Sequence, residues 1–143
     1  MGSEQGATWE PRSRVGAVVV ALVRGDQDAA ERAAERPPDE QDPRVLDAAI
    51  ELAVRSLFDE DTEPGQVAEF VATMRQDVEV DPAVAEALIR AQLGEPALLE
   101  AFPPQAVNDT TWSTLGYLCE RRLGPEDSEQ LVASAEERAL PAA

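Results

Sequence analysis

The side chains with the greatest chemical variety lie in residues 107–120. This segment holds the single cysteine, Cys119, the single tyrosine, Tyr117, and one of the two tryptophans, Trp112. A cysteine or serine nucleophile needs an activating base, which is most often histidine. The chain contains no histidine, so neither Cys119 nor the serines have the usual base. We therefore assign no catalytic residue.

Two missing residue types restrict the remaining chemistry. The lack of histidine removes the zinc-binding helix motif and the facial iron triad. All 12 basic residues are arginine, and the lack of lysine removes the Walker phosphate loop and Schiff-base chemistry. No G-x-G-x-x-G pattern occurs. We expect no cofactor, and only carboxylates, arginine and tyrosine remain for catalysis.

The segment after Phe58 resembles the start of a calcium loop. Asp59, Asp61 and Glu63 occupy its first three alternating ligand positions. The position of the sharp-turn glycine is Pro64, however, and the position of the bidentate acid is Phe70, so two requirements of the loop are not met. We assign no metal site, expect a solvated acidic turn, and keep these three acids as candidate ligands for weak cation binding.

A core helix explains residues 107–124 better than a catalytic site does. Apolar side chains recur at helical steps of three and four residues at Trp112, Leu115, Cys119 and Leu123, which predicts a buried stripe. We expect a start among Asn108, Asp109 and Thr110, which are residue types that cap helices, and a stop at Gly124 and Pro125. Gly116, inside this helix, indicates close helix packing rather than a ligand contact.

The rest of the chain has the same helical periodicity. Residues 13–23 are rich in β-branched side chains, but no second strand-like segment exists to pair with them, so a buried helix is expected. The segment 24–26 breaks or bends it before a helix over 27–36. Further helices are expected after the Asp42-Pro43 and Asp81-Pro82 start signals, near Thr62 and Pro64, and over about 126–138. The predicted fold is all-α, with about seven helices as stacked hairpins, in a compact bundle or a short helical-repeat array.

The domain organisation follows from the same reading. Residues 1–12 are expected to form a disordered leader, and residues 13–140 a single all-α domain. Residues 42–50 resemble residues 81–89 at a shift of 39, with aspartate, proline, valine, an acid, alanine and isoleucine recurring. Helical repeats have units of roughly 34–47 residues. An internal repeat of 42–80 in 81–119 is therefore one hypothesis, and a chance recurrence of a common helix start is the other.

Charge restricts the partners. The chain carries 29 acidic residues and a net charge of −17. Such a charge repels nucleic acid and anionic membrane surfaces, so neither is expected as a partner. One cysteine cannot form an internal disulfide and fits a reducing compartment, and the apolar run at 15–23 lacks a signal-peptide cleavage site. We expect a cytoplasmic protein, and its arginine-only, alanine-rich composition is typical of GC-rich bacteria.

These observations favour a non-catalytic, acidic helical module that binds a protein partner with a basic surface, as an adaptor, regulator or inhibitor. One alternative is a carboxylate-based enzyme that uses Mg²⁺ or Mn²⁺ in a helical bundle. Another is a structural or assembly component of a larger complex. The sequence leaves the oligomeric state and the identity of the partner open.

Overall fold

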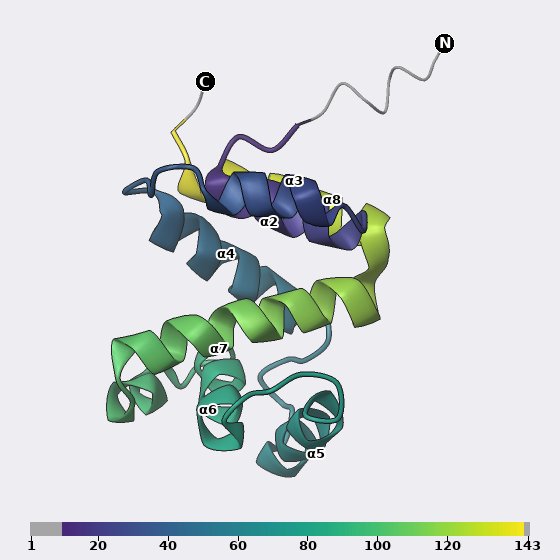
Figure 1. The fold of residues 1–143 in the computed structure, drawn as a ribbon. Helices are drawn as coiled ribbons and strands as arrows, with labels where there is room; N and C mark the ends of the chain where they lie inside the picture. Colours follow the sequence, from purple (N-terminus) through teal and green to yellow (C-terminus); the bar gives the residue numbers. More distant parts are fainter. Residues whose placement is uncertain (1–9, 142–143) are drawn as a thin grey trace. The chain divides into compact units, whose positions relative to one another are not determined.

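The computed structural model describes residues 10–141, whose regular elements are all helices (Figure 1). This part of the chain contains seven α-helices, one 3₁₀ helix and one π-helical turn, and no strand. The prediction of an all-α fold with about seven helices is confirmed. The leader predicted at 1–12 falls largely outside the described residues.

The helices group into two compact units. Of the described residues, 10–49 and 123–141 make up the first unit, and residues 50–122 make up the second. Helix α4 (Asp42–Arg55) contributes its first half to one and its second half to the other. Whether residues 13–140 form one domain therefore stays a prediction.

In the first unit, α2 (Arg14–Val23) packs against both α3 (Gln27–Ala34) and α8 (Gly124–Ala139) (Figure 1). The Ser13 hydroxyl accepts from the backbone N–H of Gly16 at 2.9 Å and caps α2. Gly25, at φ +76°, separates α2 from α3, and Asp26 caps the second helix. The β-branched segment is thus a buried helix, as expected, and residues 15–36 form two helices.

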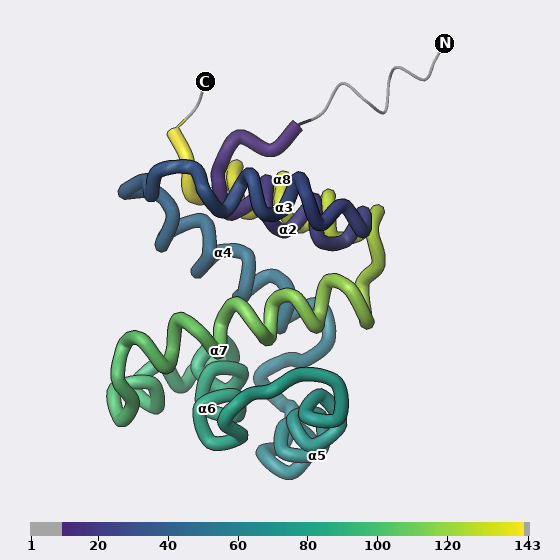
Figure 2. Tube along the Cα trace, in the orientation of Figure 1, coloured from purple at the N-terminus to yellow at the C-terminus, as the bar shows by residue number. Residues whose placement is uncertain are grey.

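In the second unit, α6 (Pro82–Gln92) contacts α5 (Pro64–Met74), α7 (Pro104–Tyr117) and the 3₁₀ helix η1 (Pro96–Ala101), whose path the tube in Figure 2 follows. Asp81 caps α6 through the backbone N–H of Ala83, as predicted. The core includes fully buried Met74, Leu88 and Ile89.

One predicted helix start is wrong. Helix α7 begins at Pro104, so Asn108, Asp109 and Thr110 lie inside it and do not cap it. Proline at a first helical position explains this earlier start, because its fixed φ suits a helix and its missing N–H needs no partner there. Helix α4 begins at Asp42, where the Asp42-Pro43 signal predicted a start, although the Asp42 carboxylate binds Arg14 and the backbone N–H of Asp39 rather than capping the helix.

The end of α7 also differs from the prediction. The helix continues as a π-helical turn, Leu118–Leu123, and α8 follows directly from Gly124, which has φ +84°. The predicted stop at Gly124 and Pro125 coincides with the end of the π-helical turn, but both residues belong to the next helix, α8. The proposed repeat stays a prediction: α4 and α5 precede α6 and α7 at a similar spacing, while η1 has no counterpart between α4 and α5.

Candidate functional site

The segment with the greatest chemical variety is part of the core of the second unit. Leu115, Leu118 and Cys119 are fully buried, and Cys119 is in no disulfide. Trp112, at the start of the predicted stripe, is only half-buried. A buried thiol among apolar side chains behaves as a small hydrophobic residue, which is the role that the spacing predicted for Cys119.

Tyr117 lies in an aromatic cluster that the helical spacing did not predict. Its ring is 5.8 Å from the Phe70 ring, which in turn is 5.2 Å from the Phe58 ring, and both pairs meet edge to face. The Arg122 guanidinium lies over Phe70, 5.5 Å from the ring centre. Edge-to-face pairs and a cation over a ring are both favourable. The cluster therefore joins α5 to the end of α7 and the following turn.

The close packing expected at Gly116 is not found. A Cβ atom added there would meet only the Glu120 carboxylate, at an ordinary distance of 3.8 Å. The glycine with close neighbours is Gly16 in α2. Its added Cβ would collide with Glu136 Oε2 and lie 2.8 Å from Val132 Cγ1.

The acidic turn after Phe58 uses its carboxylates for local contacts. Asp59 Oδ1 accepts from the backbone N–H of Asp61 at 2.9 Å and from the Thr62 hydroxyl at 3.3 Å. The Glu63 N–H donates to Gln66 Oε1 at the start of α5. Asp59, Asp61 and Glu63 are all exposed. Across residues 10–141, no group of three or more cysteine, aspartate and glutamate side chains is placed to hold a metal ion.

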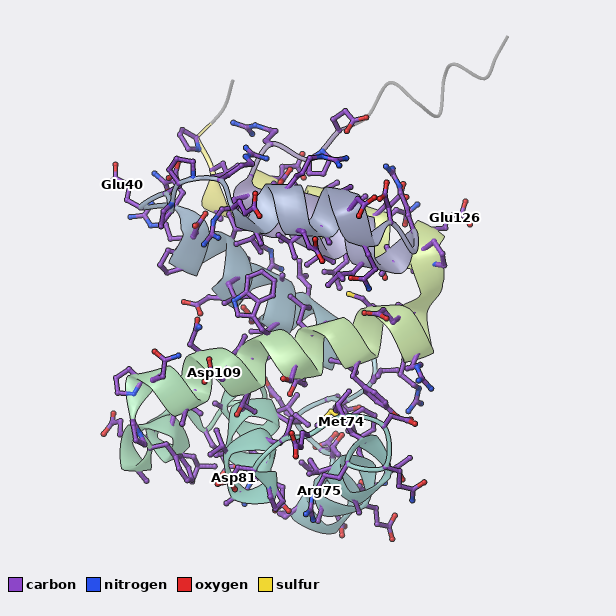
Figure 3. All side chains as sticks on the ribbon, viewed as in Figure 1. Glu40, Met74, Arg75, Asp81, Asp109 and Glu126 are labelled. Atoms are coloured by element: carbon purple, nitrogen blue, oxygen red, sulfur yellow. The ribbon has the colours of Figure 1, made fainter. Side chains whose placement is uncertain are left out.

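A shallow groove in the second unit gathers other carboxylates. It has a volume of about 230 Å³ and lies between the segment that precedes α6 and the middle of α7. Glu79 and Asp81 line it from one side and Asp109 from the other, and Figure 3 labels Asp81, just before α6, and Asp109, on α7. No arginine lines it. We call this feature the acidic groove.

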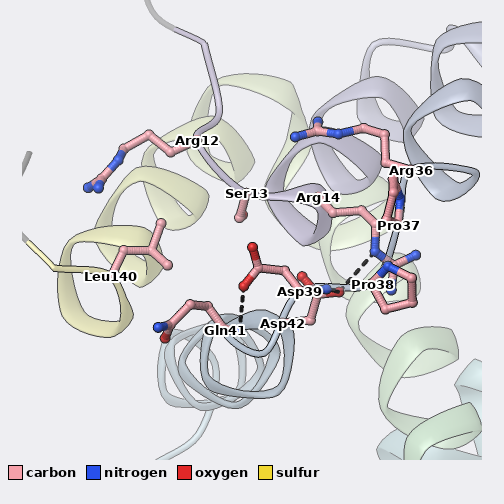
Figure 4. A pocket seen from close by; sticks show the side chains of 10 residues that line it. All are labelled: Arg12, Ser13, Arg14, Arg36, Pro37, Pro38, Asp39, Gln41, Asp42 and Leu140. Atoms are coloured by element: carbon pink, nitrogen blue, oxygen red, sulfur yellow. Dashed lines mark hydrogen bonds and ion pairs between the residues drawn. The ribbon is translucent and has the colours of Figure 1, made fainter.

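A larger cavity lies within the first unit, with a volume of about 330 Å³. Three stretches far apart in the sequence form it: residues 12–14 before and in α2, the 36–42 connection into α4, and Leu140 after α8. Three arginines, Arg12, Arg14 and Arg36, line it together with Asp39 and Asp42 (Figure 4). We call it the arginine cavity. Sequence reasoning did not find it, because no local pattern joins these three stretches.

Two residues that line the arginine cavity, Gln41 and Asp42, each carry a buried acceptor atom. Asp42 Oδ2 accepts from Arg14 Nε at 2.9 Å and from the backbone N–H of Asp39 at 3.1 Å. Neither Asp42 Oδ1 nor Gln41 Oε1 has a hydrogen-bond donor among the described residues, although both atoms are buried. Buried polar atoms without a partner are uncommon in folded proteins, but because both atoms are buried they lie out of reach of a ligand in the cavity.

A buried carboxylate holds the entry to α2 beside this cavity. Glu136 of α8, only 2% exposed, accepts from the backbone N–H groups of Arg12 and Ser13 at 2.9 and 2.8 Å and from the Ser13 hydroxyl at 2.6 Å. A carboxylate at a helix N-terminus satisfies free N–H groups and complements the helix dipole. The contacts bridge more than 120 residues of sequence, so α8 fixes where α2 begins.

Comparison with protein-family models, with curated proteins and with solved structures finds no match to this chain. Among the helices of residues 10–141, none has both the length and the apolar composition needed to cross a membrane.

Proposed function

We propose that this chain is a non-catalytic helical module that binds a protein partner with a basic surface, as an adaptor, regulator or inhibitor. The acidic groove carries this proposal. It is hollowed, it is lined by Glu79, Asp81 and Asp109, and it has no arginine in its lining. A lysine or arginine side chain of a partner would enter it as a counter-charge and would gain charge-assisted hydrogen bonds.

The charge of the second unit supports the same conclusion. Residues 50–122 contain 14 acids and five arginines. Three of these arginines already pair with acids of the unit: Arg55 with Glu51 and Glu60, Arg90 with Glu95, and Arg121 with Asp77. Most of the negative charge is therefore left to act on a partner, where it would speed association and favour basic surfaces over acidic ones.

A cytoplasmic location belongs to this proposal. The single cysteine, Cys119, is buried and in no disulfide, which suits a reducing compartment.

The test is affinity capture from the source cells with three baits in parallel. The first is the unaltered chain. The second carries Glu79→Gln, Asp81→Asn and Asp109→Asn, which remove three charges from the groove while asparagine retains the capping ability of position 81.

The control bait carries Asp28→Asn, Glu31→Gln and Glu35→Gln, three exposed acids of the first unit, so both variants lose the same charge. We expect a basic protein that the unaltered and control baits retain and the groove variant loses, with affinity that falls as salt rises. Equal retention by all three baits, or binding indifferent to salt, contradicts the proposal.

Tight, stoichiometric Mg²⁺ binding in a calorimetric titration would favour the metal-dependent enzyme instead, and a defined large oligomer in light scattering would favour an assembly component.

A further inference from the structure

The acidic groove contains a hydroxyl group that has no hydrogen-bond partner on a nearly buried residue. Thr110 of α7 lines the groove and is only 6% exposed. The hydroxyl of its neighbour Thr111 donates to the backbone carbonyl of Val107 at 2.7 Å, as threonines inside helices commonly do. The Thr110 hydroxyl makes no hydrogen bond within residues 10–141. Because buried polar side chains usually have a partner, this hydroxyl indicates a place for a ligand.

A ligand in the groove can reach this hydroxyl. The described side-chain atoms that are both buried and without a partner are Gln41 Oε1, Asp42 Oδ1 and Thr114 Oγ1. Thr110 Oγ1 is not among them, so it keeps accessible surface although the residue as a whole is nearly buried. Ser113, one turn further along α7, lines the same groove, and its hydroxyl is also without a partner in the described part of the chain.

The carboxylates of the groove also have free oxygens. One oxygen of Asp81 accepts from the Ala83 N–H and one oxygen of Asp109 accepts from Gln105 Nε2, both at 2.9 Å, so the second oxygen of each is left for a ligand. Glu79 makes no hydrogen bond or ion pair within residues 10–141. The three acids do not converge on one point as metal ligands would, because no group of three acids or cysteines in the described residues is placed to hold a metal ion.

This spread of acceptors favours a guanidinium over an ammonium group. A lysine ammonium donates from a single nitrogen, whereas an arginine guanidinium directs five N–H donors outward from a planar fork. Glu79 and Asp81 line one side of the groove and Asp109 lines the other. A guanidinium can therefore pair with acids on both sides while a further N–H donates to the Thr110 hydroxyl.

We propose that the acidic groove recognises an arginine side chain of the protein partner in preference to a lysine. This inference rests on the proposed function, because it names the group by which the basic partner is bound. The methylene stem of the arginine packs on Val80 and Ala106, which form the apolar part of the lining. The volume of about 230 Å³ is below the range of small-molecule sites, as suits a single side chain.

The first experiment compares two probes on the unaltered full chain. The isotope-labelled protein is titrated with N-acetyl-L-arginine N-methylamide and with N-acetyl-L-lysine N-methylamide, and binding is followed by two-dimensional NMR. Both probes carry one positive charge and the same capped backbone, so a difference in affinity reports the head group. We expect the arginine probe to bind at least about threefold more tightly than the lysine probe, with shifted signals from residues 79–81 and 106–113.

The second experiment tests the hydroxyl. Thr110→Val replaces the hydroxyl by a methyl group of similar size, and it should weaken binding of the arginine probe at least about threefold. Thr111→Val is the matched control, because Thr111 is the next residue of the same helix and is 5% exposed, but lies outside the lining of the groove. We expect it to bind the arginine probe as the unaltered chain does, and circular dichroism checks that both variants fold.

The proposal is overturned if the lysine probe binds as tightly as the arginine probe, if neither probe shifts the signals of the groove, or if the two threonine variants bind alike. Each of these results leaves the proposed function standing as long as the capture experiment finds a basic protein that the groove variant loses. A partner that the groove variant retains would instead contradict the proposed function, whatever the two probes show.

Discussion

Replacing Gly16 by alanine tests whether the buried Glu136 carboxylate holds the start of α2. The backbone of Gly16 is helical, so alanine suits it and would by itself gain up to about 1 kcal/mol in helix propensity. The added Cβ, however, would collide with Glu136 Oε2 and crowd Val132. Glu136 then has to leave the position from which it accepts hydrogen bonds from Arg12 and Ser13.

The expected magnitude follows from these two effects. Overpacking a core costs about 1–3 kcal/mol, and each hydrogen bond to a charged group contributes about 1.5–3 kcal/mol. If one such bond is lost and the propensity gain is subtracted, Gly16→Ala should lower the free energy of unfolding by about 3 kcal/mol. The measurement is urea denaturation followed by far-ultraviolet circular dichroism, with the midpoint and slope fitted separately.

Gly116→Ala is the matched control. Gly116 also lies inside a helix, but an added Cβ there meets only Glu120, at 3.8 Å, so the propensity gain of about 0.5–1 kcal/mol should appear as increased stability. Combining Gly16→Ala with Glu136→Ala should cost less than the sum of the two single changes, because the collision disappears with the carboxylate. A Gly16→Ala protein as stable as the unaltered chain, or additive costs in the double variant, would refute the role assigned to Glu136.

Three further outcomes are expected. The Cys119 thiol, 0% exposed, should react slowly with a thiol reagent in the native state and quickly in denaturant. A thiol that reacts fully in the native state would show that this helix faces solvent. Cys119→Asp should unfold the protein because it buries an unpaired charge. The hydrogen bonds from Arg90 lower the pKa of Glu95. The ionised pair therefore stabilises the folded state above the ordinary pKa of glutamate, and this contribution is lost as the pH falls through the lowered pKa. In an NMR titration the pKa of Glu95 should rise in Arg90→Met, and an unchanged pKa would contradict the assignment. Asp81→Ala should lower the free energy of unfolding by about 1 kcal/mol and Asp81→Asn by much less, and equal losses would rule out capping as the cause.

Local patterns predicted most of the helices because their causes are local. Asp81 caps the helix that follows it, as its position before Pro82 predicted, and the spacing of apolar side chains predicted the burial of Leu115 and Cys119. Each of these signals acts within one or two helical turns. The β-branched run at 15–23 also needed a chain-wide argument, which was that no second strand exists to pair with it.

The errors arose where two local signals competed. Asn108, Asp109 and Thr110 have good capping side chains, yet α7 starts at Pro104 and passes through them. Asp42 precedes a proline, as Asp81 does, and α4 begins there, but its carboxylate binds Arg14 and the Asp39 N–H instead of capping the helix. Gly116 gave the same sequence signal as a close-packed glycine, and only the neighbours in space show that Gly16 is the crowded one.

The sequence by itself therefore determined the all-helical class, the acidic charge and the lack of histidine- and lysine-dependent chemistry. Tertiary structure alone decided which side chains meet. Glu136 reaches Ser13 across 123 residues, and the arginine cavity joins residues 12–14, 36–42 and 140. The reason is physical: capping and periodicity act over a few residues, whereas these contacts exist only once α2 packs against α8 and the apolar faces of the first unit are buried together.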